Sequence, residues 1–459
     1  MKKKTTSSYK LPPGPKGQLL LGSLPKRRKE PLQLYMQGAL EYGDLVYYRM
    51  GPMKVVLVNN PADIKHVLQD NQKNYVKGFG YSALEPALGR GLLLSEHDFW
   101  RRQRRLAQPA FHRQRLMKFA ETMVDSTRRM LDRWAELPSP RGGQAPVVDV
   151  AQEMMRLTLG IVSRTLLSTD VSGDADTVGA ALARLFEETN RRVLAAVRWD
   201  EALPLPRNLR FKKDLATLDN VVLRIIRERR KSGVDAGDLL SMFMQTRDED
   251  TGETMDDKQL RDEVMTMFLA GHETTANLLA WTWMLLSQHP SVARKVKAEV
   301  DEVLGSRAPT FEDTARLPYI MMVLEETLRL YPPAWVLARE AVALDQLGGY
   351  DIPPKTIVVL CPWVVHRLPR LWTNPEGFDP ERFTEEACAG RHKYAYFPFS
   401  GGPRVCIGSG FALMEAQLIL AMVVQRFRLD LLPSHPIVLD PLITLRPRHG
   451  IKMTLNPIG

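Results

Sequence analysis

The stretch that decides the fold lies near the C-terminus and reads Phe399-Ser400-Gly401-Gly402-Pro403-Arg404-Val405-Cys406-Ile407-Gly408. Its glycines and its proline prevent regular secondary structure, so a loop is predicted through Val405. The apolar spacing of residues 411–426 predicts a helix directly after this loop. Cys406 is therefore expected close to a helix N-terminus, where the helix dipole favours the thiolate over the thiol.

A lone thiolate at such a position limits which metal site or cofactor Cys406 could serve. Cys406 has no neighbouring Cys or His in the sequence, so it does not match a zinc or iron–sulfur site. It suits an axial ligand of haem iron, because a thiolate pushes electron density toward O–O cleavage. On the residues alone two alternatives stay open. The side chain could be a buried small hydrophobe, or a nucleophile without a cysteine-hydrolase signature around it.

The same stretch resembles the haem-binding signature F-x-x-G-x-R-x-C-x-G of the cytochrome P450 family, and the matching residues are Phe399, Gly402, Arg404, Cys406 and Gly408. The resemblance is to a bacterial-type soluble member. It implies a mainly α (α+β) fold, with a helix-rich core and small β-sheets around a buried haem. It also implies haem b as the cofactor, Cys406 as the iron ligand, and Phe399, Arg404 and Gly408 beside the cofactor.

A long helix is predicted over residues 257–288, with Thr254 as its N-cap and Pro290 just beyond its end. Its centre reads Ala270-Gly271-His272-Glu273-Thr274-Thr275, which is poor in helix-forming residues. The hydroxyl of Thr274 is expected to bond to the carbonyl of Ala270 and leave a local bend or groove. Without further information, a kinked core helix with Glu273 at a surface is an equal alternative. The segment resembles the family motif A-G-x-[DE]-T, which implies that Glu273 and Thr274 deliver protons and that Ala270 and Gly271 lie over the haem.

Glu326 and Arg329 are three residues apart on a predicted helix, close enough to form an ion pair. Most such pairs are solvated surface contacts. Together with Arg382, however, they resemble the Glu-Arg-Arg triad of the family. The resemblance implies a structural role in folding and haem retention.

Cationic and indole donors are expected to hold the two haem propionates. Trp100 and Arg104 are spaced i,i+4, so they share one helix face, and they resemble the W-x-x-x-R of the family. Arg339 matches a propionate-binding arginine, and Arg404 is a further candidate. For each arginine alone, a role at the solvated surface is the usual one.

The composition is basic: 63 Lys and Arg against 53 Asp and Glu give a net charge of +10. Part of this charge is predicted to lie on one helix and its neighbourhood, at Arg101, Arg102, Arg105, Arg113 and Arg115. By resemblance this face docks a ferredoxin or a flavodoxin, which receives electrons from its reductase. A solvated basic face is the alternative. Nucleic acid is not expected, because no aromatic interleaving or binding motif accompanies the charge.

The implied reaction inserts one oxygen atom from O2 into a C–H or C=C bond of a hydrophobic molecule, such as a fatty acid, terpenoid, steroid or polyketide. The candidate pocket residues are Phe79, Tyr81, Ala270, Val336, Leu337 and Ile443. Ordinary core packing is the alternative for each of them. A peroxide-driven peroxygenase and a haem-binding sensor are the alternative functions, and neither would need the pair Glu273 and Thr274.

The rest of the sequence indicates the secondary structure and the domain organisation of the chain. A hairpin is predicted from residues 45–50 and 54–59, helices dominate residues 97–330, and a strand is predicted at residues 356–360. At 459 residues, a single domain over residues 1–459 is expected, with residues 1–30 as an extended N-terminal strap. No apolar run long enough for a transmembrane helix occurs, and the three cysteines are too few for a disulfide scaffold. A cytoplasmic monomer is the expectation.

Overall fold

The computed structural model describes residues 9–78, 80–138, 145–168, 203–248 and 250–458, together with 181, 184–185, 187–189 and 191–192. The chain forms two compact units. The first comprises Met1–Ser82, Ala334–Gly377 and Gly390–Cys406, and the second comprises Ala83–Pro333, Phe378–Ala389 and Ile407–Gly459.

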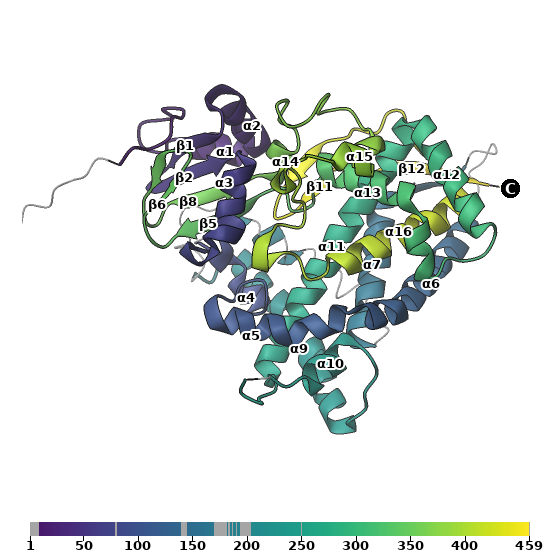
Figure 1. Cartoon of the computed structure of the whole chain (residues 1–459). Helices are drawn as coiled ribbons and strands as arrows, with labels where there is room; N and C mark the ends of the chain where they lie inside the picture. The colour runs from purple at the N-terminus through teal and green to yellow at the C-terminus, as the bar shows by residue number, and fades with distance from the viewer. Residues whose placement is uncertain are drawn as a thin grey trace, which may run out of the picture. The chain divides into compact units, whose positions relative to one another are not determined.

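The first unit is built on a five-stranded sheet in the order β1-β2-β8-β5-β3 (Figure 1). The strands are β1 (Leu45–Met50), β2 (Met53–Val58), β3 (Tyr75–Val76), β5 (Leu337–Ala341) and β8 (Ile357–Leu360), and a separate hairpin joins β6 (Asp345–Leu347) to β7 (Tyr350–Ile352). The predicted hairpin is confirmed, because β1 and β2 pair antiparallel and Gly51 turns the chain with a φ of 61°. Strand β2 pairs parallel with β8, and β5 pairs antiparallel with β8 and with β3.

The first unit also contains short helices. They are α1 (Leu24–Lys29), α2 (Pro31–Tyr42), α3 (Pro61–Lys65), the π-helical η1 (His66–Asp70), α14 (Pro362–Val365), and the 3-10 turns η2 (Gln72–Asn74), η9 (Lys393–Ala395) and η10 (Gly402–Arg404). Val56 and Val58 of β2 share one core with Ile64 and Val67, because alternate residues of a strand point to the same face. Tyr48 of β1 donates its hydroxyl proton to the carbonyl of Leu34 in α2 at 3.0 Å.

The second unit is mainly helical. Its longer helices are α5 (His97–Ala107), α6 (Arg113–Ala135), α7 (Val150–Leu167), α9 (Pro206–Ser232), α10 (Leu239–Gln245), α11 (Asp257–Gln288), α12 (Pro290–Leu304), α13 (Pro318–Leu330) and α16 (Ser409–Arg426). The shorter ones are α4 (Glu85–Leu88), η4 (Gln108–Phe111), η7 (Glu312–Arg316), η8 (Pro380–Phe383) and α15 (Glu385–Cys388), while η3 (Tyr81–Ala83) lies at the boundary of the units. The second unit also contains two small sheets. One has three strands in the order β4 (Val147–Asp149), β12 (Lys452–Pro457) and β9 (Phe427–Leu431), and the other pairs β10 (Leu439–Pro441) with β11 (Leu445–Pro447).

Helix α11 runs through the middle of the second unit and packs along α7 (Figure 1). Its C-terminal half is anchored by Trp281, which is fully buried and stacks on Tyr331 with ring centroids 4.5 Å apart. The indole Nε1 of Trp281 also donates to the carbonyl of Leu445 at 3.1 Å. These contacts fix the helix that carries the candidate acid–alcohol pair.

The predicted bounds of α11 are confirmed at residues 257 and 288, but its N-cap was placed wrongly at Thr254. The cap is Asp256, whose carboxylate accepts from the backbone N–H of Gln259 at 2.7 Å. A carboxylate at this position also interacts favourably with the positive end of the helix dipole. The helix after the cysteine loop begins at Ser409, two residues earlier than predicted.

Two further differences concern chain segments. The predicted N-terminal strap has no regular element at Leu11–Pro15, as expected, but α1 interrupts it at Leu24. The five arginines predicted on and around one basic helix are divided between α5 and α6. Pro109 lies in the 3-10 turn between these helices, because proline lacks the N–H that a continuing α-helix requires.

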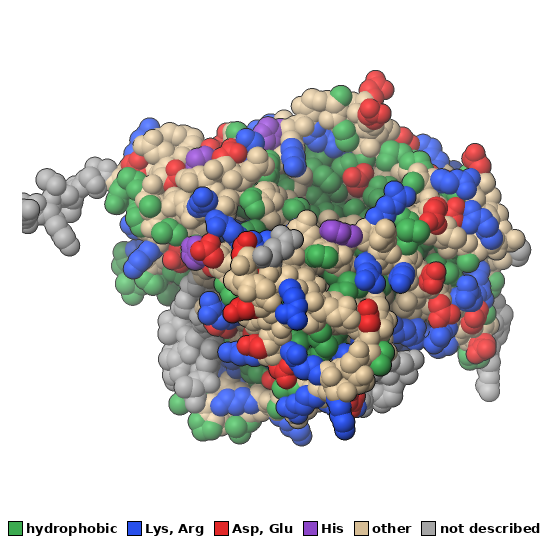
Figure 2. All heavy atoms as spheres, turned by 60° about the horizontal axis from the view of Figure 1, so that its bottom comes forward, with side chains coloured by type: hydrophobic (Ala, Val, Ile, Leu, Met, Phe, Trp, Pro, Cys, Tyr) green, Lys and Arg blue, Asp and Glu red, His purple; other side chains and the backbone are tan. Residues whose placement is uncertain are grey.

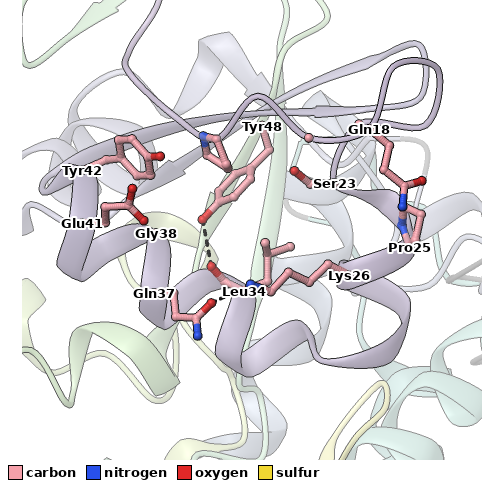
Figure 3. A pocket seen from close by; sticks show the side chains of 13 residues that line it. Gln18, Ser23, Pro25, Lys26, Leu34, Gln37, Gly38, Glu41, Tyr42 and Tyr48 are labelled. Atoms are coloured by element: carbon pink, nitrogen blue, oxygen red, sulfur yellow. Dashed lines mark hydrogen bonds between the residues drawn. The ribbon is translucent and has the colours of Figure 1, made fainter.

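Among the described residues, no helix is long and apolar enough to cross a membrane. A cavity of about 280 Å³ lies in the first unit, between the N-terminal loop and α2. Figure 3 shows Gln18, Ser23, Pro25 and Lys26 on one of its walls and Gln37, Glu41 and Tyr42 on another. None of the predicted site residues lines this cavity.

Candidate active site

The cysteine loop, residues 399–408, contains the end of the first unit, whose last residue is Cys406. The backbone N–H of Cys406 donates to the carbonyl of Phe399 at 3.0 Å, and η10 forms the turn between them. Gly402 has a φ of 64°, and a Cβ atom there would collide with the backbone carbonyl of Leu68 in η1. Glycine is therefore required for the loop to pack closely on η1. The loop presents Cys406 as an exposed residue, three positions before α16 begins, and Cys406 forms no disulfide with the two other described cysteines.

One face of α11 in the second unit is open. Most of the helix is buried, yet Ala270 is exposed and Met267, Gly271 and Thr274 are only half-buried. These positions follow the i, i+3, i+4, i+7 pattern of a single helix face. The hydroxyl of Thr274 donates to the carbonyl of Ala270 at 2.8 Å, as expected from the sequence. This face is apolar apart from the hydroxyl group of Thr274. The side chains of Ala270, Gly271 and Thr274 are small, so a flat group could lie close to the helix backbone.

Glu273 is buried, contrary to the alternative of a surface side chain. Its Oε1 accepts a hydrogen bond from the hydroxyl of Thr444 at 2.6 Å, while its Oε2 has no hydrogen-bond partner among the described residues. Burial raises the pKa of Glu273, and the Thr444 bond and the charge of Arg446 oppose that rise. A carboxyl group with a raised pKa in a buried site is a candidate for proton transfer.

The structure brings Glu326, Arg329 and Arg382 together within the second unit. Arg329 binds Glu326 with two bonds, Nε to Oε2 at 2.6 Å and Nη2 to Oε1 at 2.8 Å, and both side chains are fully buried. Nε of Arg382 lies 3.3 Å from Oε1 of Glu326, which also accepts from the backbone N–H of Asp379 at 2.9 Å. This network ties α13 to η8.

The donor set fits a haem rather than a protein-ligated metal ion. Among the described residues, no group of three His, Cys, Asp or Glu side chains could hold a metal ion. Cys406 is instead a single exposed cysteine on a glycine-rich loop that packs closely on η1. A single thiolate is the ligand that a haem iron takes from such a loop.

Comparison with known proteins gives the same answer. The family profile described as Cytochrome P450 matches residues 12–454. The chain belongs to the cytochrome P450 family. It is 37% identical over 446 residues to "Cyclooctatin synthase" of Streptomyces melanosporofaciens, covering 97% of this chain and 94% of that protein.

Two other comparisons agree. "Cyclooctat-9-en-7-ol 5-monooxygenase" of the same organism is 36% identical over 416 residues, covering 90% of this chain and 88% of that protein. The crystal structure of the cytochrome P450DA heme domain superposes with a TM-score of 0.89 at 29% identity, covering 98% of this chain and 99% of that one. The mainly helical P450 fold predicted from the sequence is confirmed.

As a cytochrome P450, the protein is a haem-dependent monooxygenase and therefore an oxidoreductase. Members of this family use dioxygen and redox partner proteins, and they bind hydrophobic substrates.

The candidate propionate ligands belong to both units of the cytochrome P450. Trp100 and Arg104 lie on α5 of the second unit, one turn apart, with Trp100 buried and Arg104 half-buried. Arg339 on β5 and Arg404 in η10 belong to the first unit. Arg339 is buried and donates from Nη1 to the carbonyl of Ala338 at 2.8 Å.

The candidate pocket residues are also divided. Tyr81, Val336 and Leu337 belong to the first unit, Ala270 and Ile443 belong to the second, and Phe79 lies outside the described residues. Ala270 is exposed and the other four described residues are half-buried, unlike fully packed core residues.

Two buried polar residues that interact with α11 were not predicted from the sequence. Thr444, which holds Glu273, follows directly after the candidate Ile443, but nothing in the sequence marks its hydroxyl. Glu415 of α16 is fully buried beside Thr275, and neither of its carboxylate oxygens has a hydrogen-bond partner among the described residues. Burial raises the pKa of Glu415 well above its ordinary value, because the apolar interior favours the uncharged form over the carboxylate. The apolar residues around Glu415 in the sequence of α16 could have indicated that its side chain is buried.

The arginines of α5 are largely paired with carboxylates. Arg101 lies 2.7 Å from Asp98, and Arg105 lies 2.9 Å from Asp248 and 2.5 Å from Asp250. Arg102 lies 3.5 Å from Glu253. Figure 2 shows the result, with Lys and Arg side chains interspersed with Asp and Glu over the surface turned forward.

Proposed function

We propose that this cytochrome P450 hydroxylates or epoxidises a cyclic terpenoid, with Cys406 as the ligand of a haem b. The observation that carries the proposal is the open face of α11, where Met267, Ala270 and Gly271 leave a flat apolar wall beside the hydroxyl of Thr274. An apolar ring system of a substrate could contact such a wall over a wide area and meet few polar groups.

The names of the relatives support a cyclic substrate. One relative is named for the 5-monooxygenation of cyclooctat-9-en-7-ol, an unsaturated cyclic alcohol. Terpenoids include such unsaturated cyclic alcohols, as do steroids, whereas straight-chain fatty acids do not. Tyr81, Val336, Leu337 and Ile443 are proposed to complete the apolar lining, together with Phe79.

The roles of the polar residues follow from their chemistry. When bound, the haem supplies the activation of dioxygen and the oxidation of the substrate. Trp100, Arg104, Arg339 and Arg404 hold the propionates by hydrogen bonds and charge, and Phe399 and Gly408 shape the loop at Cys406. The carboxyl of Glu273 exchanges protons with solvent, and the hydroxyl of Thr274 positions the proton that the reaction consumes.

A substrate experiment tests the proposal. Cyclic terpenoid alcohols added to the ferric protein are expected to displace the iron-bound water, seen as a shift of the Soret band, and to yield oxygenated products. Straight-chain fatty acids of similar carbon number serve as the matched control. A shift and turnover with the fatty acids alone would reject the terpenoid assignment.

A second experiment tests the role of Thr274. Thr274→Ala is expected to lower the product formed per electron pair consumed by about tenfold, whereas Thr274→Ser retains the hydroxyl and most of the coupling. Coupled turnover that is unchanged in Thr274→Ala would remove Thr274 from proton delivery.

The electron donor is proposed to be an acidic ferredoxin or flavodoxin that docks around Arg101–Arg115. Because Arg101, Arg102 and Arg105 are partly neutralised, Arg113 and Arg115 on α6 should carry most of the attraction. Arg113→Gln with Arg115→Gln should slow reduction and weaken its dependence on salt. Lys212→Gln with Lys213→Gln, two exposed charges on α9, is the matched control and should leave reduction unchanged. We also propose that the protein is cytoplasmic, monomeric and organised as a single domain.

A further inference from the structure

Three consecutive leucines stand out from the surface of the first unit. Leu19, Leu20 and Leu21 are 87%, 81% and 49% exposed, in the loop Gln18–Gly22 that we call the leucine loop. Single exposed leucines are ordinary, but a contiguous apolar group at a loop tip marks a contact site.

The leucine loop is held in this position by the fold. Gln18 and Gly22 exchange two backbone hydrogen bonds, at 3.0 and 2.8 Å, which close the loop. Arg49 of β1 donates from Nη2 to the carbonyl of Gln18 at 2.7 Å and also to that of Leu19. Gly22 has a φ of 59°, and a Cβ atom there would collide with the carbonyl of Arg49. The leucines are therefore fixed outward and cannot fold back onto the sheet.

The charge around the leucine loop is mainly positive. The first 29 residues of the sequence contain nine Lys or Arg and no Asp or Glu. Lys16, Lys26, Arg28 and Lys29 are exposed on either side of the loop. Two acidic residues occur in this part of the first unit: Glu30, which lies 3.7 Å from Lys29, and Glu41, which lines the same cavity as Gln18 and Lys26. Lys26 reaches across this cavity to Gln37 at 2.6 Å, so its charge is not neutralised (Figure 3).

We propose that the leucine loop and its flanking basic residues dock the protein on an anionic lipid surface. A bilayer interface is the partner that satisfies both features at once: the leucines enter the acyl boundary while the cations meet lipid phosphates. An acidic protein would match the cations but leave the leucines in water. The proposal is independent of the substrate, although docking would bring the enzyme to the phase in which hydrophobic substrates concentrate.

Vesicle sedimentation with the full-length haem-loaded protein tests the proposal. The protein is expected to sediment with vesicles of phosphatidylglycerol and phosphatidylcholine, but not with phosphatidylcholine alone, and added salt should weaken the binding. Leu19→Ser with Leu20→Ser should reduce the affinity by about tenfold or more, because two apolar side chains no longer insert. Lys16→Gln with Arg28→Gln and Lys29→Gln should reduce it through the charge alone.

Matched controls separate docking from folding and from catalysis. Leu40→Ser removes a leucine of α2 that is 61% exposed, and it should bind vesicles like the unaltered protein. Turnover of a dissolved substrate should be the same in all these variants. Failure to bind anionic vesicles, or unchanged binding after the two leucine substitutions, would overturn the proposal. Self-association that the leucine substitutions abolish, without vesicle binding, would assign the loop to contacts between copies instead.

Discussion

At the scale of single residues, the acid–base properties of Glu273 depend on one hydroxyl group. Its carboxyl is buried, and only the bond from Thr444, with the more distant charge of Arg446, offsets the cost of ionising it. Thr444 therefore acts as a positioning residue, because it sets the orientation and the pKa of Glu273.

Thr444→Val should raise the pKa of Glu273 further, since burial then acts with less opposition. The ionised form is lost as the pH falls through this pKa. The acidic limb of the pH profile of coupled product formation should therefore move to higher pH. Thr444→Ser keeps the hydroxyl and should leave the profile in place. A loss of activity equal at every pH would instead indicate a purely structural role.

At the scale of elements, the buried network on α13 is expected to determine stability and haem retention. Glu326 is fully buried and accepts bonds from Arg329 and from the backbone of Asp379. Removing one partner of a buried ion pair leaves the other charge uncompensated.

Glu326→Gln should lower the free energy of unfolding by about 3–5 kcal/mol, because the fully buried Arg329 and the partly exposed Arg382 lose their carboxylate partner. Urea unfolding measures the effect, and the haem content of the purified protein should fall with it. The exposed Glu302 of α12 offers the control Glu302→Gln, for which no change is expected. A variant that keeps full stability but loses turnover would show that Glu326 has a chemical role.

The elements also show what the sequence can and cannot provide. The bounds of α11 and the hairpin β1–β2 were predictable, because apolar periodicity and the residues Gly51 and Pro290 mark them locally. The cap at Asp256 was missed, since Thr254 is also a common capping type and the backbone geometry decides between them. Thr444 and Glu415 were missed for another reason: they meet α11 from distant parts of the chain, and no spacing rule connects them.

At the scale of the whole molecule, buried carboxyl groups make stability depend on pH. Glu263 of α11 accepts from the backbone N–H of Leu92 at 3.0 Å, but its burial, and to a smaller extent the charge of Asp262, raise its pKa from 4.5 to about 8. The folded protein then binds a proton that the unfolded chain releases.

Between pH 4.5 and about 8 the unfolded state binds fewer protons at Glu263, so stability should fall as the pH rises. The slope for one such group reaches about 1.4 kcal/mol per pH unit. Glu263→Gln keeps an acceptor for Leu92 and removes the titration, so its stability should fall less steeply over this range. Parallel stability curves for the two proteins would contradict the burial of an ionisable Glu263.

The central claim is that Cys406 binds the haem iron as a thiolate, and the spectrum of the reduced protein with carbon monoxide tests it most directly. The account predicts the red-shifted Soret band of thiolate ligation. Cys361→Ser and Cys388→Ser should retain this band, and Cys406→Ser should lose it. A haem-free protein that cannot be reconstituted, or a thiolate band that persists in Cys406→Ser, would contradict the account.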